Sequence, residues 1–174
     1  MNEHTSTTRK FSSKAVLHAA TALVTAVSLT AAADPSTDAK AKVEITRAGS
    51  QASYIGSNDT FTGRVRGDPV WPGNEHINAS GGLVTFEPGA RSAWHVHPAG
   101  QRLVVVAGVG RTQEWGQPMQ EIRPGDVVWC PPGVKHWHGA SPTTGMTHLA
   151  VTGSVDGKQV QWMEKVTDEQ YNGR

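Results

Sequence analysis

Short runs of alternating apolar and polar residues, punctuated by glycine and proline, make up the chain from about residue 43 onward. This alternation predicts β-strands that bury one face, and the glycine and proline clusters mark the turns between them. The predicted strands are residues 43–47, 61–66, 79–87, 92–97, 102–107, 111–115, 120–122, 126–130, 135–139, 146–152 and 159–164. Because no long stretch has helical periodicity, the pattern predicts an all-β, single-domain jelly roll or small β-barrel.

Two segments outside the regular strands have sequence patterns that predict a loop and a helical turn. The Asp-Pro pair at residues 68–69 and the Trp-Pro-Gly sequence at 71–73 predict a loop, which we place near the mouth of the barrel. Residues 167–171 have the signature of a helix start and predict a short helical turn near the C-terminus.

The N-terminal region has the pattern of an export signal. Arg9, Lys10 and Lys14 precede an apolar run at residues 15–27, and three alanines at 31–33 form an A-x-A cleavage pattern. The apolar run is too short and too interrupted for a membrane span. We therefore expect residues 1–33 to be a signal peptide cut after Ala33, residues 34–42 a linker and residues 43–174 the folded domain. The mature protein would be periplasmic or secreted; the alternative is a leader that stays attached.

Composition narrows the classes of partner. The 174 residues suffice for one domain with an appendage, and the net charge is only +1, with no run of Lys or Arg. A nucleic-acid surface is therefore not expected, nor a membrane contact of the mature form. Cys130 is the single cysteine, so the chain cannot form an intrachain disulfide, and we expect this side chain to be packed in the core.

Histidines at strand spacing are the main candidates for chemistry. His95 and His97 lie two residues apart in a predicted strand and so point to the same face. Gln101 follows after a Pro-Ala-Gly turn, and His136 comes after a second glycine- and proline-rich segment at residues 125–133. Neutral imidazoles suit a borderline divalent metal such as Mn, Fe, Ni or Zn, and we expect a metal site here.

Gln101 affects the chemistry that such a site supports. A carboxamide leaves the formal +2 charge of the ion unchanged, whereas a carboxylate would reduce it to +1. The site should therefore be a stronger Lewis acid, bind its metal less tightly and stabilise a higher oxidation state less well. Non-redox chemistry is favoured, and an oxygenase is disfavoured.

Two further histidines are candidate acid–base groups. His138 shares the face of His136 if the strand is regular, and His148 could face the interior from a neighbouring strand. The alternative for each is a structural, hydrogen-bonded histidine at the rim of the barrel. His76 lies in a polar loop and should be on the surface, whereas Trp94 and Trp137 alternate away from the metal face and should be core residues.

The two histidine segments resemble the paired motifs of the cupin superfamily. In the first, Gly89 is followed after five residues by His-x-His and then by Gln101, where most metal-binding cupins have Glu; the second runs from Gly125 through Pro-x-Gly to His136. Segments 84–101, 122–140, 146–150 and 162–171, together with 47–53 and 61–66, are similar to the small bacterial cupin hydroxynitrile lyases. The similarity extends from about residue 43 to residue 171.

This resemblance implies a function and a site. Members of that family bind manganese through three histidines and a glutamine, and split or form (R)-mandelonitrile-type cyanohydrins. Carried over by position, the metal ligands are His95, His97, Gln101 and His136, and the pocket histidines are His148, the first choice as acid–base group, and His138. The expected cofactor is Mn²⁺, with Fe²⁺, Ni²⁺ or Zn²⁺ as alternatives.

The same resemblance implies a small cyanohydrin or aldehyde as substrate and a homo-oligomer, dimer or tetramer, as the assembly. Two other functions stay open from the sequence. One is another non-redox lyase, decarboxylase or isomerase, related to the cupins found beside carboxymuconolactone-decarboxylase-like domains. The other is a cupin that binds a small molecule without catalysis, since a fold does not determine a function.

Overall fold

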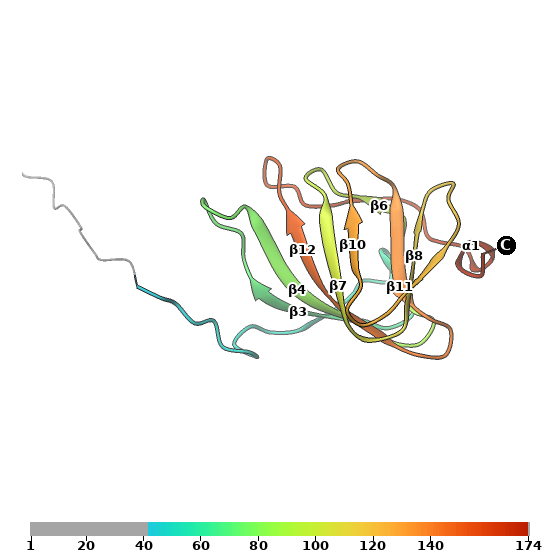
Figure 1. The fold of residues 1–174 in the computed structure, drawn as a ribbon, viewed down its shortest axis with the longest axis horizontal. Coiled ribbons are helices and arrows are strands. Elements are labelled where there is room, and N and C mark those ends of the chain that lie inside the picture. The colour runs from blue at the N-terminus through green and yellow to red at the C-terminus, as the bar shows by residue number, and fades with distance from the viewer. Residues whose placement is uncertain (1–41, 174) are drawn as a thin grey trace, which may run out of the picture. The chain divides into compact units, whose positions relative to one another are not determined.

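Two curled antiparallel sheets face each other in the computed structural model, which describes residues 42–173 (Figure 1). The first sheet has the strand order β1-β3-β4-β12-β7-β10, and the second the order β13-β6-β11-β5-β2, with β8 and then β9 added beside β11. Residues from Val43 onward form one compact unit. The predicted all-β jelly-roll architecture is confirmed.

Thirteen strands and one short helix make up the described part of the chain. The strands are β1 Tyr54–Ile55, β2 Phe61–Thr62, β3 Val65–Trp71, β4 Ala79–Phe86, β5 Arg91–Ser92, β6 His95–Val96, β7 Gln101–Gly108, β8 Gly110–Glu114, β9 Gln120–Ile122, β10 Val127–Cys130, β11 His136–Ala140, β12 Met146–Gly153 and β13 Gln161–Trp162. The helix is α1, Asp168–Tyr171. The strands expected at 79–87, 120–122, 126–130 and 146–152 agree with β4, β9, β10 and β12 to within one residue.

Several expected elements were wrong in part. Residues 43–47 are not a strand: Val43 is 94% exposed and Ile45 67%, so neither finds an apolar surface to cover. The strand expected at 61–66 is interrupted at Gly63, whose φ of 77° is open mainly to glycine. The loop expected at 68–73 begins late, because β3 continues to Trp71 through an irregularity in its pairing with β4 after Pro69.

The strand expected at 92–97 is divided into β5 and β6, and the division has a hydrogen-bonding cause. Ala93 donates its N–H to Thr60 at 2.8 Å, and Trp94 donates to Glu164 at 2.9 Å. The backbone at these two residues therefore bonds to other segments instead of continuing the pairing with β11. Similarly, of the strand expected at 159–164 only β13 forms.

Two apolar clusters stabilise the unit. The first contains Val65, Phe86, Ala90, Val105, Ile122, Ala140 and Met146, and the second Trp94, Trp137, Val166 and Tyr171. The core positions expected for Trp94 and Trp137 are confirmed, and Cys130 is buried as expected, at 4% exposure. His76 is on the surface, as expected.

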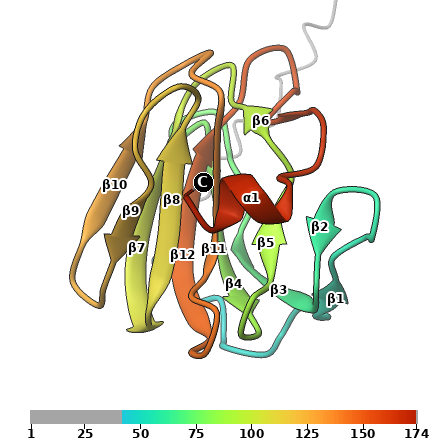
Figure 2. The same ribbon diagram turned by 90° about the vertical axis from the view of Figure 1, so that its right-hand side faces the viewer.

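The C-terminal helix is attached to the strands that carry the site. Thr167 caps α1 in a capping box with Gln170, which confirms the predicted helix start. Figure 2 shows α1 in front of β5 and β11; the Tyr171 hydroxyl donates to the Ala140 carbonyl at 2.7 Å, and Arg91 bonds the Val166 carbonyl at 3.2 Å. In residues 42–173 no helix has the length and apolar character needed to cross a bilayer. The expected signal peptide and most of the linker lie outside the described residues.

Candidate functional site

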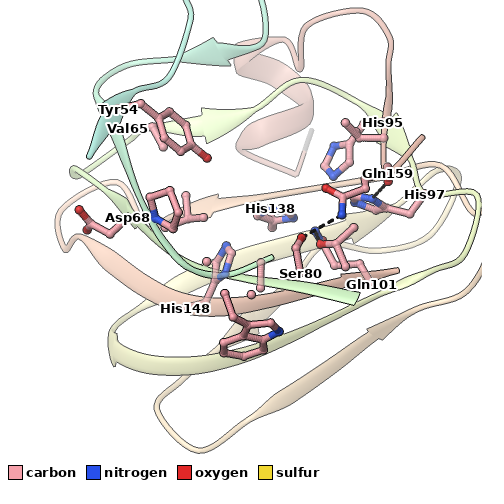
Figure 3. A pocket seen from close by; sticks show the side chains of 18 of the residues that line it. Tyr54, Val65, Asp68, Ser80, His95, His97, Gln101, His138, His148 and Gln159 are labelled. Atoms are coloured by element: carbon pink, nitrogen blue, oxygen red, sulfur yellow. Dashed lines mark hydrogen bonds between the residues drawn. The ribbon is translucent and has the colours of Figure 1, made fainter. Parts of the chain in front are cut away.

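A cavity of about 370 Å³ is lined by residues of both sheets, and five of the six polar residues singled out in the sequence, all but His136, line it (Figure 3). Its lining includes His95, His97, Gln101, His138 and His148. Aromatic and small residues line much of the remainder: Tyr54, Phe61, Trp71, Trp162, Gly81, Gly82, Val84 and Ala150. The cavity lining therefore combines histidine and amide side chains with aromatic and small residues.

Strand pairing places three of the histidines together. His95 and His136 are opposite each other in the pairing of β6 with β11, and their ring centroids are 4.3 Å apart. His97 follows β6 directly, and its ring lies 5.0 Å from that of His95 and 5.4 Å from that of His136. Local spacing and a single strand contact thus bring the two histidine segments together.

The Nδ1 atom of each of these three rings lies within hydrogen-bond distance of a backbone carbonyl. The acceptors are Ala93 for His95, Gln159 for His97 and Val134 for His136, at 2.9, 2.6 and 3.0 Å. A carbonyl can only accept, so each Nδ1 carries the hydrogen and each Nε2 has a free lone pair. The Nε2 atoms of His97 and His136 are buried and find no hydrogen-bond partner among the described residues.

Gln101 has a similar arrangement. Its Nε2 donates to the hydroxyl oxygen of Thr152 at 2.9 Å, while its buried Oε1 has no partner within residues 42–173. Buried polar atoms are nearly always paired, so a cluster that is left unpaired indicates a site for a ligand. Imidazole rings that are held through Nδ1 present Nε2 as a ligand atom, and the amide oxygen offers a further one. These ligand atoms are the kind expected for a divalent metal.

His138 lies closer to the metal candidates than the sequence suggested. Ligand atoms of His95, His136 and His138 all lie within 4.8 Å of one another, and this group, among the described residues, could hold an ion. From the sequence, His138 was predicted to be a pocket residue and a candidate acid–base group, and not a metal ligand. The available signal was the spacing of 136 and 138, which repeats the spacing of 95 and 97.

His148 occupies the far side of the histidine group. It is fully buried on β12, and its ring lies 4.9 Å from that of His138 and 5.7 Å from that of Phe86. Neither of its ring nitrogens has a hydrogen-bond partner in the described part of the chain. The prediction that the His148 side chain faces the interior is therefore confirmed.

Burial keeps the histidines in their neutral form. It lowers the pKa of His148 to about 4 and that of His136 to about 4, because a charged imidazolium is poorly solvated inside the protein. The pKa values of His95 and His138 are held well below the usual range for the same reason, with neighbouring histidines adding to the effect. Neutral imidazoles can ligate a metal or accept a proton.

The apolar wall is built by side chains that the sequence analysis did not assign to the site. Trp162 contacts Phe61 edge-to-face at 5.4 Å and lies 4.8 Å from the His95 ring. Tyr54 lies over Gly67, where a Cβ atom would be 2.1 Å from the tyrosine Cζ. These residues come from separate short strands, so no local spacing relates them to the histidine motifs.

Comparison with known proteins places the chain in a family. A cupin domain model matches residues 82–152, which contain all six of the polar site residues. A protein of Granulicella tundricola named (R)-mandelonitrile lyase is 60% identical over 129 residues, which cover 74% of this chain and 98% of that protein. The chain belongs to the cupin family. The resemblance read from the two histidine motifs is thereby confirmed.

Solved structures agree with this cupin assignment. A cupin-like protein of Thermotoga maritima has a TM-score of 0.65 at 40% identity, covering 75% of this chain and 96% of its own. The polyketide cyclase RemF of Streptomyces resistomycificus has a TM-score of 0.59 at 13% identity, covering 75% and 92%. The second likeness is one of fold alone.

Proposed function

We propose that this cupin is a metal-dependent hydroxynitrile lyase, which cleaves and forms (R)-mandelonitrile-type cyanohydrins. One observation carries the proposal. Within the described residues, His97, Gln101 and His136 each have a buried potential ligand atom without a hydrogen-bond partner, and His148 is fully buried near them. The 60% identity to a protein named (R)-mandelonitrile lyase supports the choice of reaction.

The ligands we propose are His95, His97, Gln101 and His136, and the metal is Mn²⁺, with Fe²⁺, Ni²⁺ and Zn²⁺ as alternatives. When bound there, the cation supplies Lewis-acid chemistry at the substrate hydroxyl. None of these four side chains is anionic, so the donor set leaves the positive charge of the ion undiminished. This suits a reaction in which negative charge develops on an oxygen.

His148 is the proposed acid–base group. Its pKa of about 4 keeps it neutral near pH 7, and the one ring nitrogen that carries no hydrogen can accept the proton of the cyanohydrin hydroxyl. As that O–H bond breaks, the carbon–carbon bond cleaves and its electron pair leaves with cyanide. The proton held by His148 then passes to cyanide, so the products are an aldehyde and hydrogen cyanide. His138, whose ring is 4.9 Å away, is the second candidate.

The aromatic wall suits an aryl aldehyde. Phe61 and Trp162 line the cavity and contact each other edge-to-face, and aromatic side chains favour offset or edge-to-face contact with a further ring. Gly82 of β4 and Ala150 of β12 also line the cavity, and their small size leaves room for an aryl ring. Apolar surroundings also exclude water from the reacting groups.

The test is benzaldehyde release from racemic mandelonitrile by Mn²⁺-loaded protein, with the enantiomer of the remaining substrate determined. The His148→Asn variant should keep its metal and lose roughly 100- to 10,000-fold in kcat. His76→Asn, at an exposed position, is the matched control and should behave as the parent protein. Absence of turnover by metal-loaded parent protein would reject the hydroxynitrile lyase and leave the other non-redox enzymes and the binding cupin as the remaining functions. Full activity of His148→Asn would transfer the acid–base role to His138.

A further inference from the structure

We propose that Thr152 is a positioning residue that decides which end of the Gln101 amide faces the metal position. The inference rests on the metal site of the proposed function and extends it by one residue. Thr152 has no expected role from the sequence motifs, and it lies 51 positions from its partner.

The pairing of β7 with β12 makes the contact possible. Thr152 is directly opposite Gln101 in this antiparallel register, and residues opposite each other share one face of a sheet. Both side chains are buried, at 8% and 6% exposure, and both line the cavity. The hydrogen bond from Gln101 Nε2 to Thr152 Oγ1 therefore lies beside the metal position and is shielded from competing water.

The two ends of a carboxamide are similar in size and opposite in function. The oxygen offers lone pairs to a cation, whereas the NH₂ group offers only hydrogens and would repel it. In the structure the Thr152 hydroxyl, which can donate or accept, accepts from the NH₂ group, and this bond holds the orientation in which Oε1 faces inward. Oε1 is the end that has no hydrogen-bond partner among residues 42–173, so its lone pairs can bind a cation.

The strand on the other side of Gln101 offers no strong competitor for the NH₂ group. Cys130 is opposite Gln101 in the pairing of β7 with β10. Burial raises the pKa of the Cys130 thiol to about 12, so it stays a neutral thiol, which is a poor acceptor. Among the described residues, the hydrogen bond recorded for this NH₂ group is the one to Thr152.

A carboxylate at the same position would not need this control, because its two oxygens are equivalent. Gln101, unlike Glu, must present its oxygen and not its NH₂ group to the metal. The hydrogen bond to Thr152 meets this requirement. This difference provides a test that separates orientation from simple packing.

The experiment measures the dissociation constant for Mn²⁺ by electron paramagnetic resonance of the free ion, in the intact protein. Thr152→Val is nearly isosteric and removes the acceptor; we expect Mn²⁺ binding to weaken roughly 10-fold or more, as is common when a group behind a metal ligand is lost. Thr152→Ser keeps the hydroxyl and should bind within about 2-fold of the parent. In a Gln101→Glu background, Thr152→Val should cost less than about 2-fold, a coupling that a double-mutant cycle measures.

Parent-like Mn²⁺ binding by Thr152→Val would overturn the inference. Equal losses in the Gln101 and Gln101→Glu backgrounds would also overturn it, because a packing defect acts on both alike. If the parent protein bound none of Mn²⁺, Fe²⁺, Ni²⁺ and Zn²⁺, both this inference and the proposed metal site would fall. Binding that depends on the Thr152 hydroxyl, in a protein that releases no benzaldehyde, would support the inference and reject the proposed reaction alone.

Discussion

Gln101 is the residue whose chemistry matters most to the proposed reaction. Its amide oxygen is buried and unpartnered within the described chain, and the other three proposed ligands are neutral imidazoles. The donor set therefore adds no negative charge beside a reacting oxygen. Charge at this single position can be changed with almost no change in shape.

We expect Gln101→Glu to bind Mn²⁺ at least as tightly as the parent, because an anionic oxygen is the better ligand for a hard cation. It should also lose on the order of 2–3 kcal/mol of transition-state stabilisation, which is roughly 30- to 150-fold in cyanohydrin cleavage. Rates are compared after metal content has been equalised by elemental analysis. Full activity in fully metallated Gln101→Glu would contradict the Lewis-acid argument.

Two alanine variants separate the possible ligand sets. The proposed set includes His97, whereas the group with ligand atoms within 4.8 Å contains His138 in its place. We expect His97→Ala to abolish measurable Mn²⁺ binding and His138→Ala to retain it, with both proteins keeping the far-ultraviolet circular dichroism of a β-rich fold. The reverse outcome would assign the ion to His95, His136 and His138.

At the scale of elements, β11 connects the parts of the site. It carries His136 and His138, pairs with β5, β6 and β8, and is buried at all five of its residues. Gly139 allows the close approach to β5, because a Cβ atom there would lie 2.4 Å from the Ala90 carbonyl oxygen. A shift of this strand would displace two histidines at once.

Gly139→Ala should therefore lower the free energy of unfolding by about 1–3 kcal/mol, the usual cost of overpacking, and weaken Mn²⁺ binding. The matched control is Gly82→Ala on β4, where the nearest atom to an added Cβ is 3.7 Å away. Urea unfolding of the metal-free variants measures the stabilities. If Gly139→Ala unfolded at the same urea concentration as Gly82→Ala, the close packing of β11 on β5 would be contradicted.

For the whole molecule, burying several neutral histidines makes stability depend on pH. The pKa of His148 in the folded protein is about 4, below the value of about 6.5 for an exposed imidazole. Between these values the unfolded chain binds more protons, so the free energy of unfolding rises with pH. The contribution is fully present above about pH 6.5 and is lost as the pH falls toward 4.

Metal-free protein should accordingly lose stability between pH 6.5 and pH 4, on the order of 3 kcal/mol from His148 alone. Urea unfolding at pH 7 and pH 4.5 measures the loss. His148→Leu should show a smaller dependence on pH, and His76→Gln, at the exposed position, the same dependence as the parent. An unchanged pH dependence in His148→Leu would show that His148 is not neutral and buried in the folded state.

We also propose that the chain is exported and that the mature protein begins at Asp34, from the alanines at 31–33. The compact unit Val43–Arg174 contains every proposed site residue, so we expect the processed and full-length proteins to have equal metal affinities. Intact mass of the protein from a periplasmic or secreted fraction measures the cleavage site. A cytoplasmic chain that keeps residues 1–33 would contradict the proposal.

What the sequence determined by itself was the set of features that depend on near neighbours. The alternation in residues 79–87 and 146–152 predicted β4 and β12, because side chains of a strand must alternate between faces. The spacing of His95, His97, Gln101 and His136 within two motifs was enough to select the candidate ligands and the cupin fold. The same local reasoning was wrong for residues 43–47, where alternation exists but no surface covers it.

Only the tertiary structure decided the contacts between distant segments. It brought Thr152 to Gln101, the Gln159 carbonyl to His97 and the rings of Tyr54 and Trp162 to the cavity wall. It also keeps His148 neutral, because the loss of solvation that lowers its pKa comes from burial and not from its neighbours in sequence. Backbone geometry determines spacing along a strand, whereas strand register and packing determine what each side chain meets.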